Sequence, residues 1–210
     1  KQQRELVSCL AWYGVNHVEA IILSHGDTDH ISGISQVVET IPVQYLFMEE
    51  GQAERETVEE ILMMCKNRNT VLAPIAETGT LQLAENQIVL QVYGDSAAGT
   101  NGRELTAVVK NASVIAAFPG DLAIAEVREF VEDQKKITVW TVPHHGSRNS
   151  ADERLYQQLC QKGVKQAIIS AGIDNHYGHP HQEVLNFLQQ QQIAVYRTDQ
   201  QGALCLRLAK

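Results

Sequence analysis

The sequence lacks the features that mark several special classes of protein. No apolar run reaches the ~18–20 residues that a bilayer-spanning helix needs. The chain does not open on a charged and then apolar stretch, so no signal peptide is expected. Basic residues are few, since 17 Lys and Arg stand against 25 Asp and Glu and give a formal net charge of −8. Clustered cations drive binding to phosphate backbones, so this balance argues against a protein that mainly coats nucleic acid, although an enzyme can still neutralise phosphate with bound metal.

The four cysteines, Cys9, Cys65, Cys160 and Cys205, are far apart in the sequence. They form no C-x-x-C pair, and no histidine stands at zinc-finger spacing from them. A zinc finger and a thioredoxin-type motif are therefore excluded, and a dense disulfide framework is not expected. Plain buried or half-buried thiols are the simplest interpretation.

Helical and strand patterns alternate along the chain. The clearest helix covers 53–67, where Val58, Ile61, Leu62 and Cys65 recur at helical spacing between acidic residues. The patterns predict further helices over 3–13, 33–39, 122–131, 152–160 and 183–191, and strands over 18–23, 43–48, 80–83, 88–93, 105–109, 113–118, 137–142, 166–170, 193–196 and 203–208. The strands between 80 and 118 are joined by turns bearing Gly or Asn, which indicates a meander. With no internal linker or repeat, 1–210 is predicted to form one α/β domain.

Metal-capable side chains are concentrated directly after the strand 18–23. His25, Asp27, Asp29 and His30 stand within six consecutive positions. Two carboxylates and two imidazoles packed this closely repel and desolvate one another unless a cation compensates them. This spacing therefore favours a metal site over a purely structural role.

Three more loops with such residues also follow predicted strands. Asp121 comes after the strand 113–118, although a Gly-Asp step there is commonly only a turn with a helix cap. His144 and His145 follow the strand 137–142, and the loop 176–181, with three more histidines, follows the strand 166–170. Seven of the eight histidines fall in these loops and the one after 18–23. Since ligand sites in α/β folds gather at the carboxyl ends of strands, we expect the loops to meet in one cleft.

These motifs resemble those of a known family. The stretch His25-x-Asp27-x-Asp29-His30 resembles the H-x-[HD]-x-D-H signature of the metallo-β-lactamase superfamily. With the loops 144–147 and 177–181, it is similar to one branch, the C-terminal hydrolase domain of the competence DNA-uptake protein ComEC and its stand-alone relatives. Further matches are Phe118-Pro119-Gly120-Asp121 and the ending Tyr196-Arg197-Thr198-Asp199-x-x-Gly202. The resemblance runs from about residue 6 to 208 and implies an αββα sandwich, two mixed sheets flanked by helices, here expected to lack the family's first strands.

The resemblance also implies a site for two divalent metal ions, manganese or zinc. One ion would be held by His25, Asp27 and one histidine of the pair His144 and His145, the other by Asp29, His30 and His179, with Asp121 bridging both. Two such ions activate a water molecule and stabilise charge on a phosphoryl group. Asp27 stands where the superfamily more often has histidine, so the site is richer in oxygen, which shifts the expectation from zinc alone towards manganese.

Further roles are assigned to neighbours of these ligands. Asp29, His145 and His181 are the candidate catalytic residues, and either histidine is placed to protonate a leaving oxygen. Substrate contacts are expected from Ser147, Arg148 and His181. Two structural alternatives stay open, because His181 can cap the last predicted helix and Ser147 can cap the helix that follows it.

The leading hypothesis is a metal-dependent phosphodiesterase that degrades DNA, with single strands as the expected substrate. One alternative is a small phosphodiester or a phosphocholine ester, which the charge of −8 favours because a long polyanion is repelled away from the metals. Another is a degenerate binding domain that has lost turnover, and hydrolysis of β-lactams is least expected. The ComEC resemblance implies a parent protein with a channel part in the cytoplasmic membrane and this domain on the outer side.

Overall fold

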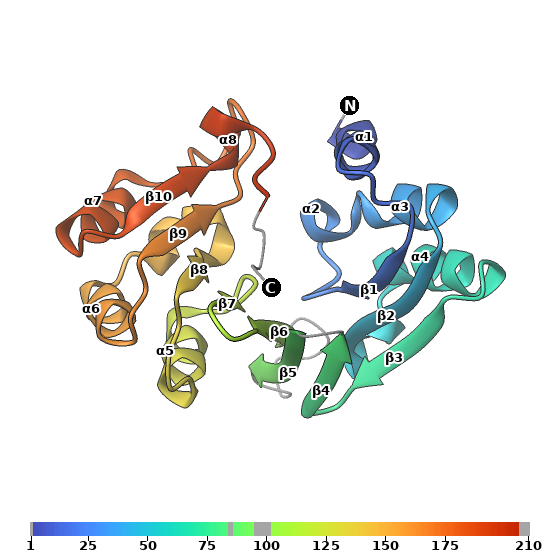
Figure 1. The fold of residues 1–210 in the computed structure, drawn as a ribbon, viewed down its shortest axis with the longest axis horizontal. Helices are drawn as coiled ribbons and strands as arrows, with labels where there is room; N and C mark the ends of the chain where they lie inside the picture. Colours follow the sequence, from blue (N-terminus) through green and yellow to red (C-terminus); the bar gives the residue numbers. More distant parts are fainter. Residues whose placement is uncertain (1, 84–85, 95–101, 206–210) are drawn as a thin grey trace. The chain divides into compact units, whose positions relative to one another are not determined.

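A computed structural model describes residues 2–83, 86–94 and 102–205 of the chain. These residues form two compact units (Figure 1). The first unit comprises 1–78 and 94–105, and the second comprises 79–93 and 106–210. Each unit has its own sheet and its own buried core, so each is described by itself.

The first unit is a small parallel α/β layer. Its elements are α1 (Gln2–Trp12), β1 (Val18–Ile22), α2 (Thr28–Ile31), α3 (Ile34–Thr40), β2 (Val43–Glu49), the 3₁₀ helix η1 (Glu50–Glu54), α4 (Glu56–Asn67) and β3 (Val71–Ile75). The strands pair in the order β1-β2-β3, and both pairings are parallel. Parallel strands need a crossover connection, which α2 and α3 supply after β1 and α4 supplies after β2.

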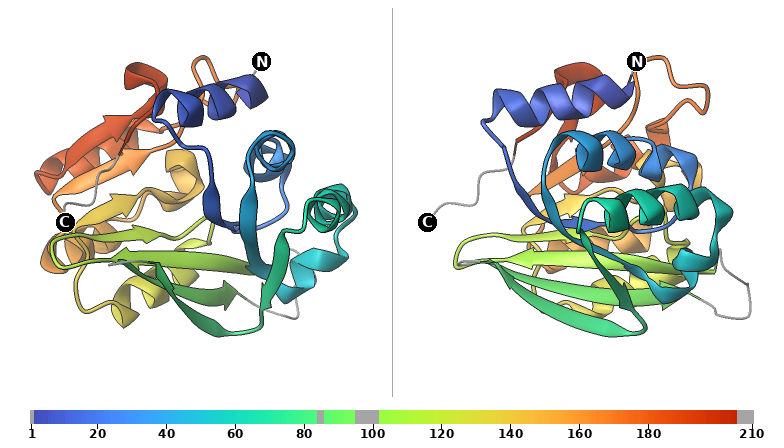
Figure 2. Two further views of the ribbon diagram at one scale, coloured as in Figure 1. Left: turned by 45° about the vertical axis from the view of Figure 1, so that its right-hand side comes forward. Right: turned by 90° about the vertical axis from the view of Figure 1, so that its right-hand side faces the viewer.

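One face of this sheet carries the core of the first unit. Ile21, Leu46 and Leu72 lie in register across the three strands. Helices α3 and α4 pack on that face, and α1 packs against α3 (Figure 2). The apolar stripe of α4 buries Val58 and Ile61, as its helical spacing predicts. Each such aliphatic side chain contributes ~1.5–3 kcal/mol when it is fully removed from water.

The second unit is built on a larger mixed sheet. Its strands are β4 (Thr78–Leu83), β5 (Asn86–Gly94), β6 (Arg103–Lys110), β7 (Ile115–Phe118), β8 (Val139–Thr141), β9 (Gln166–Ile169) and β10 (Ala194–Arg197). Its helices are α5 (Ile124–Asp133), η3 (Pro143–Gly146), η4 (Arg148–Ser150), α6 (Glu153–Gln161), α7 (Gln182–Gln190) and α8 (Thr198–Gln201). In the described residues the order is β10-β9-β8-β7-β6-β5-β4, which places the meander β4 to β7 beside the parallel strands β7 to β10.

The core of the second unit lies between this sheet and three helices. Ala117, Trp140 and Ala167 are neighbours across β7, β8 and β9, so two small side chains flank one indole. Helices α5, α6 and α7 pack over them on the same face (Figure 1). Phe130 of α5 lies 6.2 Å from the Trp140 ring, centroid to centroid. This packing fixes the carboxyl ends of β7, β8 and β9, from which the second unit's candidate ligands extend.

Most predicted elements are confirmed, although the short helices α2 and α8 were not predicted and three further differences have a physical reason. The sequence pattern missed β3, because Pro74 interrupts it, but β3 is an edge strand of its sheet, where a missing backbone N–H is tolerated. The helix expected over 53–67 is divided at Arg55, whose extended backbone (φ −79°, ψ 131°) separates η1 from α4. The strand expected over 203–208 is wrong for 203–205, which are not in a strand, and its remainder lies outside the described residues.

Within the described ranges, the structure contains no helix with the length and apolar character required to span a membrane.

Candidate metal centre

The first group of predicted ligands lies in the loop after β1 and at the start of α2. Asp27 is the N-cap residue of α2, with an extended backbone (φ −77°, ψ 150°), and its side chain makes no capping hydrogen bond. The carboxylate is therefore not used to satisfy the helix end. Asp29 and His30 follow within the helix itself.

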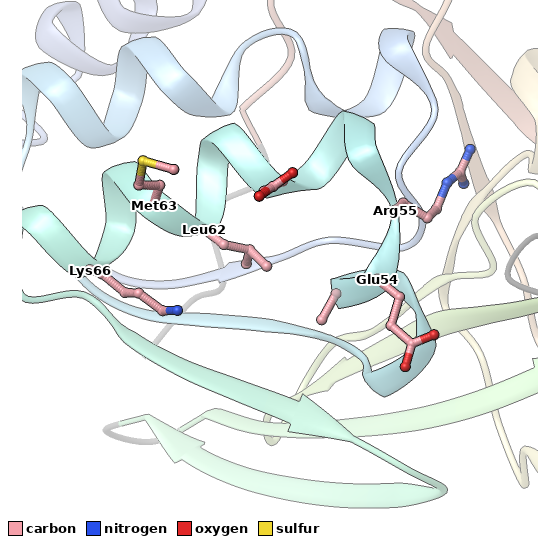
Figure 3. Close-up of a pocket in the computed structure, with 7 residues that line it drawn as sticks. Glu54, Arg55, Leu62, Met63 and Lys66 are labelled. Carbon is pink, nitrogen blue, oxygen red and sulfur yellow. The ribbon is translucent and has the colours of Figure 1, made fainter.

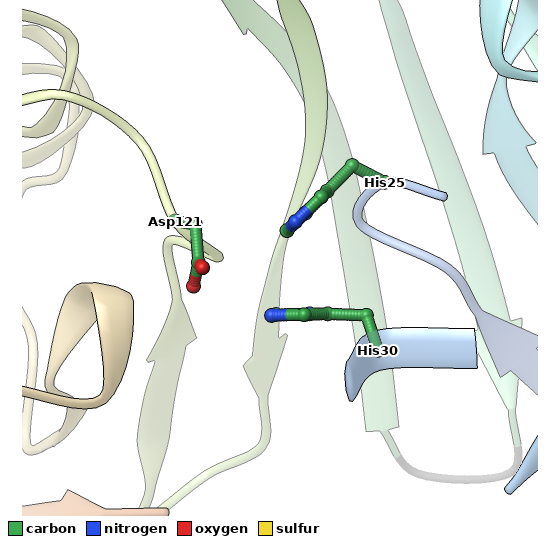
Figure 4. Close-up of side chains that lie close together, drawn as sticks. All are labelled: His25, His30 and Asp121. Carbon is green, nitrogen blue, oxygen red and sulfur yellow. The ribbon is translucent and has the colours of Figure 1, made fainter. Parts of the chain in front are cut away.

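This loop brings its ligand-type side chains together, and we call it the His25 cluster (His25, Asp27, Asp29 and His30). The rings of His25 and His30 lie side by side, with centroids 4.0 Å apart, and point the same way (Figure 4). His25 Nε2 is 3.6 Å from Asp27 Oδ2. One carboxylate oxygen of Asp29 lies within 4.8 Å of a ring nitrogen of His30. Each of the four residues predicted here therefore has a ligand-type atom within 4.8 Å of one from another member of the cluster.

Two charged side chains that sequence reasoning missed, Arg55 and Glu104, contact members of this cluster. The guanidinium of Arg55 donates from Nη2 to Asp27 Oδ1 at 2.7 Å. A carboxylate oxygen of Glu104 lies 3.3 Å from His25 Nδ1. The hydroxyl of Ser24 lies 3.2 Å from the same nitrogen. His25 and Asp27 therefore each have a partner on the atom that is not paired with the other residue.

The backbone of the loop is clamped at Gly26. Its N–H donates to Gln52 Oε1 at 2.8 Å, and its carbonyl accepts from Thr57 Oγ1 at 2.9 Å. A Cβ at this position would lie only 2.6 Å from Cγ2 of Val58, which is fully buried. Glycine is required here by this close approach of α4, because any larger residue would push the loop away.

Beside Arg55 the first unit also has a surface pocket of about 460 Å³ (Figure 3). It is lined by Ala53, Glu54, Arg55, Glu59, Leu62, Met63 and Lys66. Arg55 lies at one end and Lys66 at the other, along the outer side of α4 (Figure 3). None of the candidate site residues predicted from sequence lines this pocket. Its two basic and two acidic side chains favour neither an anionic nor a cationic ligand.

The second group of predicted ligands extends from the ends of β7, β8 and β9, and we call it the His144 cluster (Asp121, His144, His145, His179 and His181). Asp121 Oδ2 is 4.0 Å from His144 Nε2 and 3.9 Å from His145 Nε2. The ring centroids of His144 and His179 are 6.1 Å apart, and those of His179 and His181 are 5.4 Å apart. The expectation that strand-end loops converge therefore holds for the three loops of this unit.

The backbone that presents the histidine pair is strained. His144 and His145 both have positive φ, 50° and 55°, within the short helix η3. Residues with side chains adopt this conformation rarely, and it costs of order 1–3 kcal/mol at each position. His145 Nδ1 donates to the carbonyl of Ser170 at 2.9 Å, which leaves Nε2 on the side of Asp121. Since the two histidines are almost equally close to Asp121, the choice between them as ligand stays open.

The surroundings of His179 favour the neutral form of its imidazole. Burial lowers its pKa first, the nearby His181, His144 and His145 lower it further, and Asp121 partly opposes them. Metal binding requires the neutral imidazole. Within the described residues, the buried Nδ1 atom of His179 has no hydrogen-bond partner. A buried nitrogen without a hydrogen-bond partner, near three histidines and a carboxylate, fits a cation better than it fits a closed polar network.

The three residues predicted to contact substrate, Ser147, Arg148 and His181, have different surroundings. Ser147 caps η4, because its hydroxyl accepts from the N–H of Asn149 at 3.3 Å. Arg148 is exposed and lies 3.7 Å from a carboxylate oxygen of Glu183. His181 is the N-cap residue of α7, but its side chain makes no capping hydrogen bond. The capping alternative therefore describes Ser147, and the His181 ring is not used to cap its helix.

Sequence comparison gives two curated relatives, and no family model matches the chain. The chain is 31% identical over 208 residues to ComE operon protein 3 of Bacillus subtilis, covering 98% of this chain and 26% of that protein. It is 28% identical over 188 residues to Recombination protein 2 of Haemophilus influenzae, covering 88% of this chain and 22% of that protein. The chain thus spans about a quarter of the length of these relatives.

Solved structures give the fold. The metallo-β-lactamase fold protein YhfI from Bacillus subtilis matches with a TM-score of 0.59 at 12% identity, over 91% of this chain and 79% of that one. Igni18, a metallo hydrolase from Ignicoccus hospitalis, matches with a TM-score of 0.55 at 13% identity, over 85% and 75%. This chain is ComEC-like and has the metallo-β-lactamase fold. Both the fold class and the family resemblance inferred from the motifs are confirmed.

In this ComEC-like chain, sequence reasoning found the ligand-type residues and missed those that hold them. The residues that hold the loop lie 26 to 79 positions away from the residues that they contact. Gln52 and Thr57 bind Gly26, Arg55 binds Asp27, and Glu104 contacts His25. Each is a common surface residue type, and no spacing within the sequence links it to the loop. The division of the helix at Arg55 is the structural feature that turns Gln52 and Arg55 towards it.

Proposed function

We propose that this chain is a metal-dependent phosphodiesterase that cleaves DNA, and that the His25 and His144 clusters supply the ligands of two divalent ions. The observation that carries the proposal is the donor set of each cluster. In each cluster carboxylates and imidazoles lie close together on a metallo-β-lactamase fold. The second nitrogen of His25 is bound by Glu104, and that of His145 by the Ser170 carbonyl. Similarity to ComE operon protein 3 over nearly the whole chain supports a role in DNA uptake.

The proposed division of the ligands is the one that the family resemblance implies. His25, Asp27 and one histidine of the 144–145 pair would hold one ion, Asp29, His30 and His179 would hold the other, and Asp121 would serve both. The ions, manganese or zinc, would supply Lewis-acid activation of water and stabilisation of phosphoryl charge. The four carboxylate and imidazole side chains of the His25 cluster include two aspartates, and this oxygen content suits manganese as well as zinc.

The protein's own groups would complete the reaction. The Ser170 carbonyl holds the proton on His145 Nδ1, so His145 Nε2 faces Asp121 as an acceptor. The His181 ring, which is not engaged in capping, is the proposed proton donor to the leaving oxygen. The Arg148 side chain is exposed and its ion pair with Glu183 is long, at 3.7 Å, so it can turn to a distal phosphate of the strand. Ser147 is the weaker candidate for a substrate contact, because its hydroxyl caps η4.

The biological setting is part of the proposal. ComEC-like relatives about four times as long imply a parent protein associated with the cytoplasmic membrane, in which this segment would act on the outer side beside a channel part. Single-stranded DNA is the proposed substrate. A small phosphodiester or phosphocholine ester is the second candidate, and the net charge of −8 favours it because long polyanions are repelled.

The deciding experiment combines metal content with DNA degradation. Purified protein should bind two Mn²⁺ or Zn²⁺ per chain and degrade single-stranded DNA, and chelation should stop the reaction. Asp121→Ala should lower both metal content and the rate of degradation, by at least 100-fold for the rate. Asp133→Ala is the matched control, since it removes a carboxylate of the second unit that binds the Tyr93 hydroxyl instead. Cleavage that survives chelation would contradict the proposal.

Two further outcomes separate the alternatives. A small chromogenic phosphodiester offered together with single-stranded DNA identifies the better substrate through the ratio of kcat/KM values. Hydrolysis of the small ester with no effect of competing DNA would favour the second candidate. Metal content near zero in a folded protein would instead favour a binding domain without turnover.

A further inference from the structure

We propose that Glu104 and Arg55 are positioning residues of the His25 cluster, an inference that rests on the metal-binding function proposed above. Glu104 holds His25 and Arg55 holds Asp27, each by the atom that faces away from the other ligand. The other ligand-type atoms of the pair, His25 Nε2 and Asp27 Oδ2, lie 3.6 Å apart. The pair forms half of a metal site before any ion arrives.

Glu104 sets the orientation of the imidazole. Its carboxylate is 3.3 Å from His25 Nδ1, and both side chains are largely buried, with 13% and 5% of their surface exposed. A carboxylate at one ring nitrogen retains the proton there and leaves the other nitrogen as the ligand. The backbone fixes the distance, because Leu105 N–H donates to the Ser24 carbonyl at 2.9 Å and so joins the strand of Glu104 to the loop of His25.

Arg55 sets the orientation of the carboxylate. Asp27 alone would be free to turn, since 56% of its side chain is exposed, but the Arg55 side chain is only 15% exposed. Arg55 is itself fixed, because Nη1 donates to Gln52 Oε1 at 3.3 Å while Nη2 binds Asp27 Oδ1. A guanidinium reaches both acceptors with its planar fork, and a lysine amine does not offer that geometry. With Oδ1 engaged, Oδ2 is the oxygen left for a metal.

One buried amide connects the Arg55 contact to the loop. Gln52 Oε1 accepts from Arg55 and also from the N–H of Gly26, while Gln52 Nε2 donates to the Arg103 carbonyl at 3.0 Å. Arg103 directly precedes Glu104, so the same amide binds the segment that carries the second positioning residue. Pre-orientation of ligands lowers the entropy lost on binding. Loss of such an outer partner typically weakens metal affinity 10–100-fold.

The test measures metal affinity rather than activity. Isothermal titration with Mn²⁺ and with Zn²⁺ is compared for wild type, Arg55→Met and Glu104→Ala, with Arg55→Lys and Glu104→Gln as conservative variants. We expect 10–100-fold weaker binding in the first two and partial recovery with Glu104→Gln but not with Arg55→Lys. Arg68→Met is the matched control, because Arg68 also donates from Nη2, to the Glu39 carbonyl, and its loss should leave affinity unchanged.

A double variant separates positioning from a general structural effect. If Arg55 acts through Asp27, Arg55→Met should weaken binding no further in an Asp27→Asn background. Additive losses there would overturn the assignment of Arg55, and unchanged affinity in Glu104→Ala would overturn that of Glu104. Visible spectra of the Co²⁺ form should also change in the variants, while circular dichroism without metal should not. Wild type that binds no metal would overturn the proposed function and this inference together, whereas tight wild-type binding with unaffected variants would overturn the inference alone.

Discussion

The two ligand clusters are held in position by different means. In the His25 cluster no residue has a positive φ, and the loop is fixed by side chains from η1 and α4, because Gln52 binds the Gly26 N–H and Thr57 binds the Gly26 carbonyl. In the His144 cluster the main device is the backbone itself, because His144 and His145 are both in the left-handed region. Outer contacts there come from the Ser170 carbonyl, which binds His145, and from the Asn175 side chain, which accepts from the His179 N–H and donates to the His179 carbonyl.

This difference predicts where each cluster is vulnerable. A loop clamped by side chains depends on residues distant in sequence, and changes in them act by releasing the loop. A loop held in a strained conformation depends on the packing that enforces the strain, because the conformation costs free energy by itself. Substitutions that change only local backbone preference should therefore act in opposite directions at the two clusters.

The largest effect is expected at the backbone-held cluster, from Gly146→Ala. Gly146 has φ +80°, and a Cβ there would lie 2.7 Å from Cβ of Pro180 and 3.2 Å from its Cα. Conformational strain and a collision with a neighbouring backbone add, so we expect a loss of about 3 kcal/mol in the free energy of unfolding, measured by urea denaturation. Metal affinity should also fall, since Pro180 stands between His179 and His181.

Gly178→Ala is the control for that prediction. Gly178 also has positive φ, +68°, but a Cβ there meets nothing within 4 Å. Strain alone should then cost about 1 kcal/mol. Equal losses from the two substitutions would show that contact with Pro180 does not enforce the conformation of η3.

A smaller effect is expected at the clamped cluster, from Gly26→Ala. Gly26 has no positive φ, so the whole cost is the contact of the new methyl group with Val58 Cγ2 at 2.6 Å. Overpacking of this kind costs roughly 1–3 kcal/mol. In a Val58→Ala background the same substitution should cost at least 1 kcal/mol less, because the colliding methyl group is absent. Denaturation of all four proteins in one double-mutant cycle gives the coupling, and a cycle without coupling would contradict the close packing of α4 on the loop.

The fold was predictable where local pattern and packing agree. The run 18–23 and the helical stripe of Val58 and Ile61 follow one periodicity from sequence to core. The strand β3 was not predictable, because Pro74 argues against a strand unless its edge position is known. The break at Arg55 was also missed, since the sequence around it has good helix formers and only tertiary contacts divide η1 from α4.

The site was predictable to the level of residue type. Candidate ligands such as Asp27 and His30 are close in sequence, and residues of these types have few structural roles at that spacing, so the pattern is easy to recognise. Glu104 was not identified as a functional residue, because one glutamate on a strand is ordinary and its contact with His25 depends on the pairing of distant segments. The left-handed backbone of His144 has no sequence signal either, because nothing marks it except the glycine that follows the pair.

The smallest expected effect compares glycine with alanine at one histidine of each cluster. At position 144, where φ is +50°, His144→Gly should be more stable than His144→Ala by about 1 kcal/mol, because alanine pays for the left-handed conformation and glycine does not. At position 25, where φ is not positive, the order should reverse, since glycine gains more entropy in the unfolded chain. All four variants lose an imidazole, so ligand loss cancels within each pair. Thermal denaturation in the presence of a chelator measures both differences, and the same order at the two positions would contradict the claim that only the His144 cluster is held by its backbone.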